Sequence, residues 1–505
     1  MKTILNISLL ATLILCISSC VQEKKYRQKS LVGLDSEIEN LIAEHHAAGI
    51  AVAVVKGGKT IYTEGFGYRD YENKLAVDEH TVFGIGSCTK AFTASVLGTL
   101  QDEGKLKFTD TPNTYLPNLE FYNQGMNDSI QIKNLLTHST GINSWPSEST
   151  AILFITPNKY DLIPRIKQIK PLTGVNKSWI YNNLMYSIAG MVAEKASGKS
   201  LENQWQEKIF NPLGMSNSYV GWEEASENKN FSHGYAVDSI TPSKVLQEDM
   251  ATRGAGGAIY SSVNDMSKWM QLWLNEGEYD NKQILSKKYV QSATSFLNKL
   301  PDNPRDSLNP VDRYYGYGWG NWIHRGYKRV EHSGGTSGYV SNVVLYPEEK
   351  LGIVVLSNQT TTSLSSMITN RIVERLYPEL KENKLETRFG QTFTIAPADT
   401  PTIQNPKNRP SYELSKLTGT YMHPGFGEFK IYLKDKTLFA DFPLTTFRLE
   451  YTGDNTFIDH HTTQIPLTYW NFMNLVFQEN TENNTINSVS INLDEEPVIF
   501  TRQNN

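Results

Sequence analysis

The chain has 505 residues, which is more than one hydrophobic core usually covers, so we expect at least two domains. Hydrophobic residues make up 39% and charged residues 20% of the chain, as in an ordinary globular protein. The net charge is −5, the pI is near 6.1 and no stripe of Lys and Arg stands out, which argues against a nucleic-acid partner.

The N-terminus is typical of an export signal. Residues 4–17 form an apolar stretch that is too short and wrongly flanked to span a membrane. A run of small residues then closes on Cys20, which resembles a bacterial lipoprotein signal: residues 1–19 would be removed, Cys20 lipidated, and 20–32 would form a tether. Ordinary cleavage near Ser19 is the alternative. Either way we expect an exported protein of the periplasm or cell envelope.

Cysteine usage adds one structural constraint. Of the three cysteines, Cys16 belongs to the predicted signal peptide and Cys20 is the candidate anchor, so only Cys88 is left for the folded part. A single cysteine forms no intrachain disulfide, and we expect packing to stabilise the fold. For Cys88 itself we expect a buried small residue without a catalytic part.

Residues 33–377 are predicted to form an α+β domain. Strand patterns occur at both ends of this region and helical patterns lie between them, which predicts an antiparallel sheet completed by both ends, in an α/β sandwich with a helical subdomain. The predicted elements are a helix over 35–47, a hairpin over 50–65, helical and mixed segments over roughly 87–310, strands over 339–346 and 351–357, and a helix over about 361–377.

The last part of the chain has a different texture. Residues 378–410 contain repeated prolines and no periodicity, which is typical of an interdomain linker. Over 411–505, short alternating runs are separated by turn signals, which predicts a small all-β meander or barrel. The predicted strands lie at 429–433, 437–442, 447–451, 474–477 and 489–493.

A Ser-x-x-Lys pattern opens an apolar helical pattern, so that Ser87 and Lys90 lie one turn apart on one face. A serine hydroxyl needs a neighbouring base to become a nucleophile, and a neutral lysine amine can serve. The helix N-terminus also favours negative charge beside Ser87. Alone the spacing is a weak signal, because residues 226–229 share it and a helix cap would explain it.

Two further segments supply polar groups. In Tyr181-x-Asn183, the phenol can carry protons and the amide can both donate and accept hydrogen bonds. Farther along, His332 precedes a Gly-Gly pair that leads into the predicted strand at 339. His332 could orient polar groups of a substrate, and the N–H groups of Gly335 and Ser87 could form an oxyanion hole. Each pattern recurs elsewhere, so an ordinary turn or strand end would explain each one alone.

The combination and order of these motifs carry a specific resemblance. Ser87-x-x-Lys90, Tyr181-x-Asn183 and His332-x-Gly334 resemble the class C β-lactamase family, which includes low-molecular-weight penicillin-binding proteins, D-amino-acid peptidases and carboxylesterases. The resemblance covers about 30–377, with supporting segments at 135–142, 212–215, 256–262 and 317–320. Residues 412–502 resemble the lipocalin-like barrel domain that some members carry.

The resemblance implies a serine hydrolase that forms an acyl-enzyme. The implied roles are nucleophile for Ser87, general base for Lys90 and Tyr181, substrate binding for Asn183, His332 and Gly334, and oxyanion binding for the nitrogens of Ser87 and Gly335. No metal or organic cofactor is implied. The expected partners are a peptide, ester or cell-wall-derived substrate and a membrane reached through the lipid on Cys20, without nucleic acid; the oligomeric state stays open.

His332 is the main departure, because lysine is common at this position in β-lactamases. An unperturbed histidine has a pKa of ~6.5 and is a poorer anchor for a β-lactam carboxylate at neutral pH. We therefore predict weak or no β-lactamase activity and favour peptides with D-amino acids, or small esters. Two alternatives stay open: a penicillin-binding covalent sensor or cell-wall binder with slow deacylation, and an inactive scaffold lipoprotein.

Overall fold

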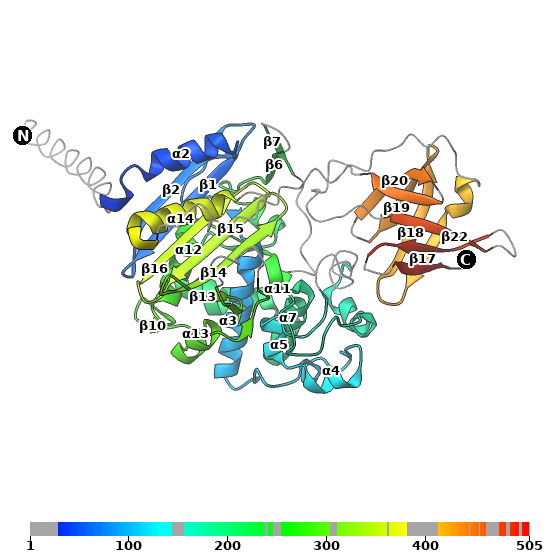
Figure 1. The fold of residues 1–505 in the computed structure, drawn as a ribbon, viewed down its shortest axis with the longest axis horizontal. Helices are drawn as coiled ribbons and strands as arrows, with labels where there is room; N and C mark the ends of the chain where they lie inside the picture. The colour runs from blue at the N-terminus through cyan, green and yellow to red at the C-terminus, as the bar shows by residue number, and fades with distance from the viewer. Residues whose placement is uncertain are drawn as a thin grey trace, which may run out of the picture.

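The computed structural model describes residues 29–143, 156–237, 241–245, 254–302, 311–360, 363–380, 413–443, 445–453, 455–460, 474–480, 485–493 and 497–503 (Figure 1). The predicted signal peptide, Cys20 and most of the predicted tether and linker lie outside these residues. Within them, no helix is long and apolar enough to cross a membrane.

The first domain is built on a nine-stranded antiparallel sheet. Strand β1 pairs with β2 on one side and with β16 on the other, so that Ile50 lies opposite both Phe66 and Ser357. The two ends of the domain therefore meet in the sheet, as the sequence predicts. In spatial order the strands are β11 (Asn298–Lys299), β12 (Arg313–Tyr315), β13 (Gly320–His324), β14 (Tyr327–Thr336), β15 (Tyr339–Tyr346), β16 (Leu351–Ser357), β1 (Gly49–Lys56), β2 (Lys59–Asp70) and β3 (Leu75–Ala76).

Both faces of this sheet are buried at β1, β15 and β16. On β1, Ile50 and Val52 pack under α2 (Leu34–Glu44) and α14 (Leu364–Leu376), while Ala51 points into the opposite core. A strand covered on both faces has no polar side, which explains the continuous apolar run in the sequence. The helix expected over 35–47 ends at Glu44, because His46 takes a left-handed φ of 50°.

Helices fill the other side of the sheet. Helix α3 is buried along nearly its whole length; its Phe92 stacks on Trp269 of α12 with ring centroids 3.9 Å apart. Gly98 of α3 is required, since a Cβ there would lie 2.3 Å from the ring of Tyr289. The helices of this region are α3 (Thr89–Asp102), α4 (Gln124–Ser129), α5 (Ile132–Leu136), α7 (Asn183–Ser197), α8 (Leu201–Trp205), α9 (Asn211–Leu213), α10 (Trp222–Ser226), α11 (Gly254–Gly257), α12 (Val263–Leu274) and α13 (Lys287–Ala293).

The described residues of this domain also form three small sheets apart from the main one. One of them has the order β4-β8-β5, and it matters here because β4 leads into the Ser87 segment. The small-sheet strands are β4 (Phe83–Gly84), β8 (Ile259–Ser261), β5 (Tyr219–Val220), β6 (Tyr235–Val237), β7 (Pro242–Lys244), β9 (Glu278–Tyr279) and β10 (Lys282–Gln283).

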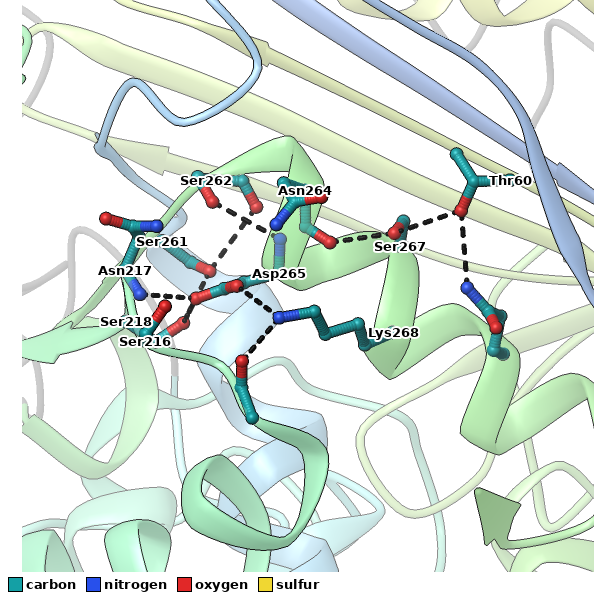
Figure 2. A network of polar contacts seen from close by, with 12 residues as sticks. Thr60, Ser216, Asn217, Ser218, Ser261, Ser262, Asn264, Asp265, Ser267 and Lys268 are labelled. Atoms are coloured by element: carbon teal, nitrogen blue, oxygen red, sulfur yellow. Dashed lines mark hydrogen bonds and ion pairs between the residues drawn. The ribbon is translucent and has the colours of Figure 1, made fainter. Parts of the chain in front are cut away.

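A buried carboxylate ties α12 to the loop before β5 (Figure 2). Asp265 is fully buried and accepts hydrogen bonds from the Asn217 N–H at 2.6 Å and from the Ser218 hydroxyl at 3.1 Å. Lys268 adds a charged partner at 3.1 Å, and the Ser262 side chain caps the start of α12. A buried charge needs such partners, and the network extends to β8 through the Ser218 and Ser261 hydroxyls, which lie 2.8 Å apart.

The C-terminal region forms a closed eight-stranded barrel, which confirms the predicted all-β domain. Its interior is filled with aromatic rings, such as Phe429 stacked on Phe442 at 4.4 Å. The barrel contacts the first domain where Arg165 Nη1 donates to the carbonyl of Phe426 at 3.3 Å. The strands are β17 (Gly419–His423), β18 (Gly427–Lys434), β19 (Thr437–Phe442), β20 (Thr445–Gly453), β21 (Thr456–His460), β22 (Asn474–Asn480), β23 (Thr485–Ile491) and β24 (Val498–Arg502).

Candidate active site

Ser87 lies in a 3₁₀ turn, Gly86–Cys88, between β4 and α3. Strand β8 holds this turn on both sides. The Ile85 N–H donates to the carbonyl of Ile259 at 3.0 Å, and the Ile259 N–H donates to the Thr89 hydroxyl at 3.2 Å. The serine is therefore presented by a backbone that is hydrogen-bonded before and after it.

The serine turn lies directly against β14. Gly86 has φ +48°, and a Cβ on it would lie 2.7 Å from the Gly335 nitrogen. A Cβ on Gly334 would lie only 2.0 Å from the carbonyl oxygen of Ile85. Glycine is thus required at both positions by close backbone approach. The same approach brings the amide of Gly335 next to the backbone at Ser87, where an oxyanion hole is predicted.

The hydroxyl of Ser87 accepts two hydrogen bonds. Lys90 Nζ donates to Ser87 Oγ at 3.1 Å, and the Tyr181 hydroxyl donates to the same oxygen at 2.8 Å. Lys90 is fully buried, and its amine nitrogen also donates to Asn183 Oδ1 at 2.7 Å and to the carbonyl of Gly256 at 2.9 Å. These contacts fix the amine beside the serine. A proton can pass among these groups without large motion.

The turn that presents Tyr181 and Asn183 is anchored on His138. Helix α7 begins at Asn183, and the Asn182 side chain caps it by accepting from the Met185 N–H at 3.2 Å. The Asn182 N–H donates to His138 Nδ1 at 3.1 Å, and the His138 ring lies 4.4 Å from that of Tyr181. Burial, with Lys90 nearby, lowers the pKa of His138 well below its usual value, so it is neutral and can accept.

His332 lies beside the site with both ring nitrogens in contact with protein atoms. Its Nδ1 lies 2.6 Å from the carbonyl of Ser333, so this nitrogen carries the proton, and Nε2 accepts from the Tyr315 hydroxyl at 2.7 Å. Burial, followed by the charge of Lys90, lowers the pKa of His332 to about 3. The ring is neutral, and its contact with substrate stays a prediction.

Cys88 follows the serine but points away from it, into the core. Its sulfur contacts the carbonyl of His332 at 3.3 Å and the Ser341 hydroxyl at 3.2 Å. Burial raises the pKa of this thiol to about 12. A thiol so far from ionisation is a poor nucleophile, and the thiol is buried as the sequence predicts.

Sequence reasoning assigned no role to three rings near the site. His138 lies in the segment 135–142, which resembles the family, but its left-handed φ of 58° is not visible in the sequence. Tyr315 lies on β12, and its contact with His332 depends on strand pairing across β13. Trp179 is half-buried, with its ring centroid 6.0 Å from that of Tyr181 and 6.1 Å from that of Tyr315. Its only signal was its position two residues before Tyr181.

The site has the chemistry of a serine hydrolase: an oriented hydroxyl, a buried amine and a phenol in contact with it, and the Gly335 amide close to the backbone at Gly86. In the described part of the chain, no group of three or more His, Cys, Asp or Glu residues could hold a metal ion.

Comparison with known families agrees with this class. The family described as Beta-lactamase matches residues 34–375, and the chain belongs to this family. A second match, over residues 404–502, is to a domain of unknown function, DUF3471. The predicted family and the predicted fold, a beta-lactamase/transpeptidase-like α+β domain followed by a β-barrel, are thereby confirmed.

Two similar proteins and one similar structure come from three different organisms. Unguisins hydrolase ungD of Aspergillus violaceofuscus is 25% identical over 422 residues, which cover 76% of this chain and 73% of that protein. Protein flp of Staphylococcus aureus is 25% identical over 352 residues, which cover 70% and 66% of the two chains. The structure of the octameric penicillin-binding protein homologue from Pyrococcus abyssi has a TM-score of 0.60 at 24% identity and covers 93% of this chain and 100% of that one, which shows a shared fold.

Proposed function

We propose that this protein cleaves amide or ester substrates through an acyl-enzyme formed on Ser87. The observation that carries the proposal is the pair of hydrogen bonds on one oxygen: Ser87 Oγ accepts from Tyr181 at 2.8 Å and from Lys90 at 3.1 Å. A serine poised between two groups that exchange protons is what acyl transfer needs. Membership of the beta-lactamase family and a relative named as a hydrolase support the same reaction class.

In the acylation step, one member of the Lys90–Tyr181 pair starts deprotonated and takes the proton of the Ser87 hydroxyl, while Ser87 Oγ forms a bond to the substrate carbonyl carbon. The carbonyl oxygen becomes an oxyanion, which the N–H groups of Ser87 and Gly335 stabilise; each such donor contributes about 3 kcal/mol in well-studied enzymes. The bond to the leaving group then breaks, and the leaving atom takes a proton from Tyr181. Water releases the acyl group by the same path in reverse.

For substrates, we propose peptides that contain D-amino acids, or small esters, with weak or no turnover of β-lactams. The carboxylate of a β-lactam needs a cationic partner at the position of His332. That ring is neutral, with its pKa lowered to about 3, and both its nitrogens already contact Ser333 and Tyr315. Efficient penicillin hydrolysis by the purified protein would contradict this part of the proposal.

The experiment is to treat the protein with a fluorophosphonate probe, p-nitrophenyl esters, D- and L-amino-acid anilides and labelled penicillin. We expect label on Ser87 and turnover of at least one ester or anilide, with a loss of about 10⁴-fold or more in Ser87→Ala. Ser226→Ala is the matched control, because exposed Ser226 heads a second Ser-x-x-Lys pattern. Absence of both label and turnover would contradict the proposal; a burst without turnover would favour a covalent sensor instead.

Export and anchoring through a lipid on Cys20 are a separate part of the proposal, supported by the apolar stretch that ends at this residue. The test is the intact mass of the chain extracted from bacterial membranes, beside Cys20→Ala. We expect a diacylglycerol-modified chain that begins at Cys20 and a variant found in the soluble fraction. An unmodified chain cleaved near Ser19 would show ordinary secretion.

A further inference from the structure

The leaving group of the substrate must depart on the side of Tyr181. Lys90 Nζ and the Tyr181 hydroxyl both contact Ser87 Oγ, at 3.1 and 2.8 Å. Lys90 is also held by Asn183 and Gly256, which leaves Tyr181 to protonate the departing atom. The predicted oxyanion hole lies elsewhere, at the amides next to β14. The surroundings of Tyr181 therefore decide which leaving groups fit.

Those surroundings are aromatic. Trp179 packs against Tyr181 and against Tyr315, with ring centroids 6.0 and 6.1 Å apart, and it approaches His138 at 5.9 Å. His138 and Tyr315 are buried, but Trp179 is partly exposed. Trp179 thus offers an apolar ring face next to the proton donor of the reaction, as an aromatic side chain in a substrate pocket does.

The same side of the site offers no cation at His332. Both nitrogens of this ring contact protein atoms, Ser333 O at 2.6 Å and Tyr315 Oη at 2.7 Å, so neither is left to bind an anionic group. An anionic leaving group would lose its hydration at His332 without gaining a charged partner there, and the nearby amine of Lys90 already has three acceptors, which makes such a group unfavourable.

We propose that Trp179 forms the wall of an apolar leaving-group subsite and makes the enzyme prefer esters and amides with an aromatic or branched aliphatic, uncharged leaving group. This inference rests on the proposed function, because it assumes that Tyr181 protonates the leaving group. It assigns Trp179 a direct contact with substrate and not only a supporting contact with Tyr181.

The test uses the methyl, benzyl and 4-carboxybenzyl esters of one carboxylic acid. Their alcohols have similar basicity, and all three esters form the same acyl-enzyme on Ser87. We expect the native protein to prefer the benzyl over the methyl ester by about tenfold or more in kcat/KM, and over the carboxybenzyl ester by a similar factor. In Trp179→Ala the benzyl-to-methyl ratio falls by about tenfold, and in Trp179→Phe by less.

Tyr432→Ala is the matched control. Tyr432 is also a partly exposed aromatic residue in a ring pair, stacked on Phe439 at 5.3 Å in the barrel, and we expect its removal to leave the ratio as it is. Should Trp179→Ala lower kcat/KM equally for all three esters, or slow hydrolysis of the shared acyl-enzyme, the ring would act only by supporting Tyr181 and the inference would be wrong. The inference would also be wrong if the native protein had equal kcat/KM values for the methyl and benzyl esters.

These outcomes differ from failure of the proposed function. If Ser87→Ala hydrolyses the esters as fast as the native protein, the nucleophile is wrong, whatever the ratios are. If Ser87→Ala is inactive but Trp179→Ala keeps the native ratio, the proposed function holds and only the subsite assignment fails.

Discussion

The two domains fill their interiors in different ways. The core of the first domain contains ionisable side chains, among them Lys90, Asp265 and His332. Within the described residues of the barrel, Ser490 is the only buried polar one, and the rest of the interior is apolar. Buried polar groups require partners at fixed positions, whereas apolar rings require only volume. The first domain can therefore hold reactive side chains, but only where their partners lie at fixed positions. The barrel interior is stabilised by the packing of apolar side chains.

The largest effect should come from removing the buried amine. Lys90→Met keeps the volume of the side chain but removes the donor to Ser87 Oγ and leaves Asn183 Oδ1 and the Gly256 carbonyl without it. We expect kcat/KM for the best ester to fall by about 10³-fold or more, since the serine loses its base. Stopped-flow or steady-state ester hydrolysis measures this, with circular dichroism to check the fold.

Lys268→Met is the matched control for this change. Lys268 also belongs to a buried polar network, through its bond to Asp265 at 3.1 Å, but this network is centred on Asp265 of α12 and does not include Ser87 (Figure 2). We expect lower stability and near-native kcat/KM. If both lysine variants lost activity to the same extent, the effect of Lys90→Met would be structural, and Lys90 would have no separate role in the reaction.

A substitution in the barrel core should lower stability and leave activity nearly unchanged. Phe429→Ala empties a position that stacks on Phe442 and packs against Phe500, and we expect the barrel to lose about 3–5 kcal/mol of unfolding free energy. Ester hydrolysis should change by less than about threefold, because the residues described in contact with Ser87 all belong to the first domain. Urea unfolding followed by near-UV circular dichroism, beside kinetics, separates the two effects. A large loss of activity would show that the barrel supports the site.

Much of the fold is local and could be read from the sequence. The strands expected over 339–346 and 351–357 match β15 and β16, because long β-branched runs with a turn between them have few other solutions. Strand β21 was missed, as its five residues are followed by residues without a strand pattern. The extent of β14, from Tyr327 to Thr336, was missed because glycines and polar residues interrupt its pattern.

The site was predicted mainly by the order of its motifs. Spacing alone did not distinguish Ser87 from Ser226; the apolar helical pattern after Ser87 and the combination with Tyr181 and His332 did so. The contacts of His332 could not be predicted, since they depend on Tyr315, which reaches it through the pairing of β12, β13 and β14. Such ring contacts are set by tertiary packing, and one sequence holds no pattern for them.

The neutral His332 gives a pH-dependent test of the statement that the first domain buries ionisable side chains. Its pKa is about 3 in the folded chain and ~6.5 when unfolded, so below pH 6.5 the unfolded state takes up the proton first. The stabilisation is fully present above pH 6.5 and is lost as pH falls toward 3, reaching about 2 kcal/mol of loss at pH 5. We expect urea unfolding to show this extra loss between pH 7.5 and 5 relative to His332→Gln. An equal loss in both would mean that His332 is exposed enough to titrate normally.

The smallest effect concerns the thiol beside the nucleophile. Cys88 is buried, its sulfur contacts the His332 carbonyl and the Ser341 hydroxyl, and burial raises its pKa to about 12. Iodoacetamide at neutral pH should therefore leave the native protein unmodified and active, and should alkylate Cys88 only after unfolding. Cys88→Ala should cost about 1 kcal/mol of stability and change kcat/KM by less than about threefold. Rapid alkylation of the native chain with loss of ester hydrolysis would place the thiol within the site and would contradict its assignment to the core.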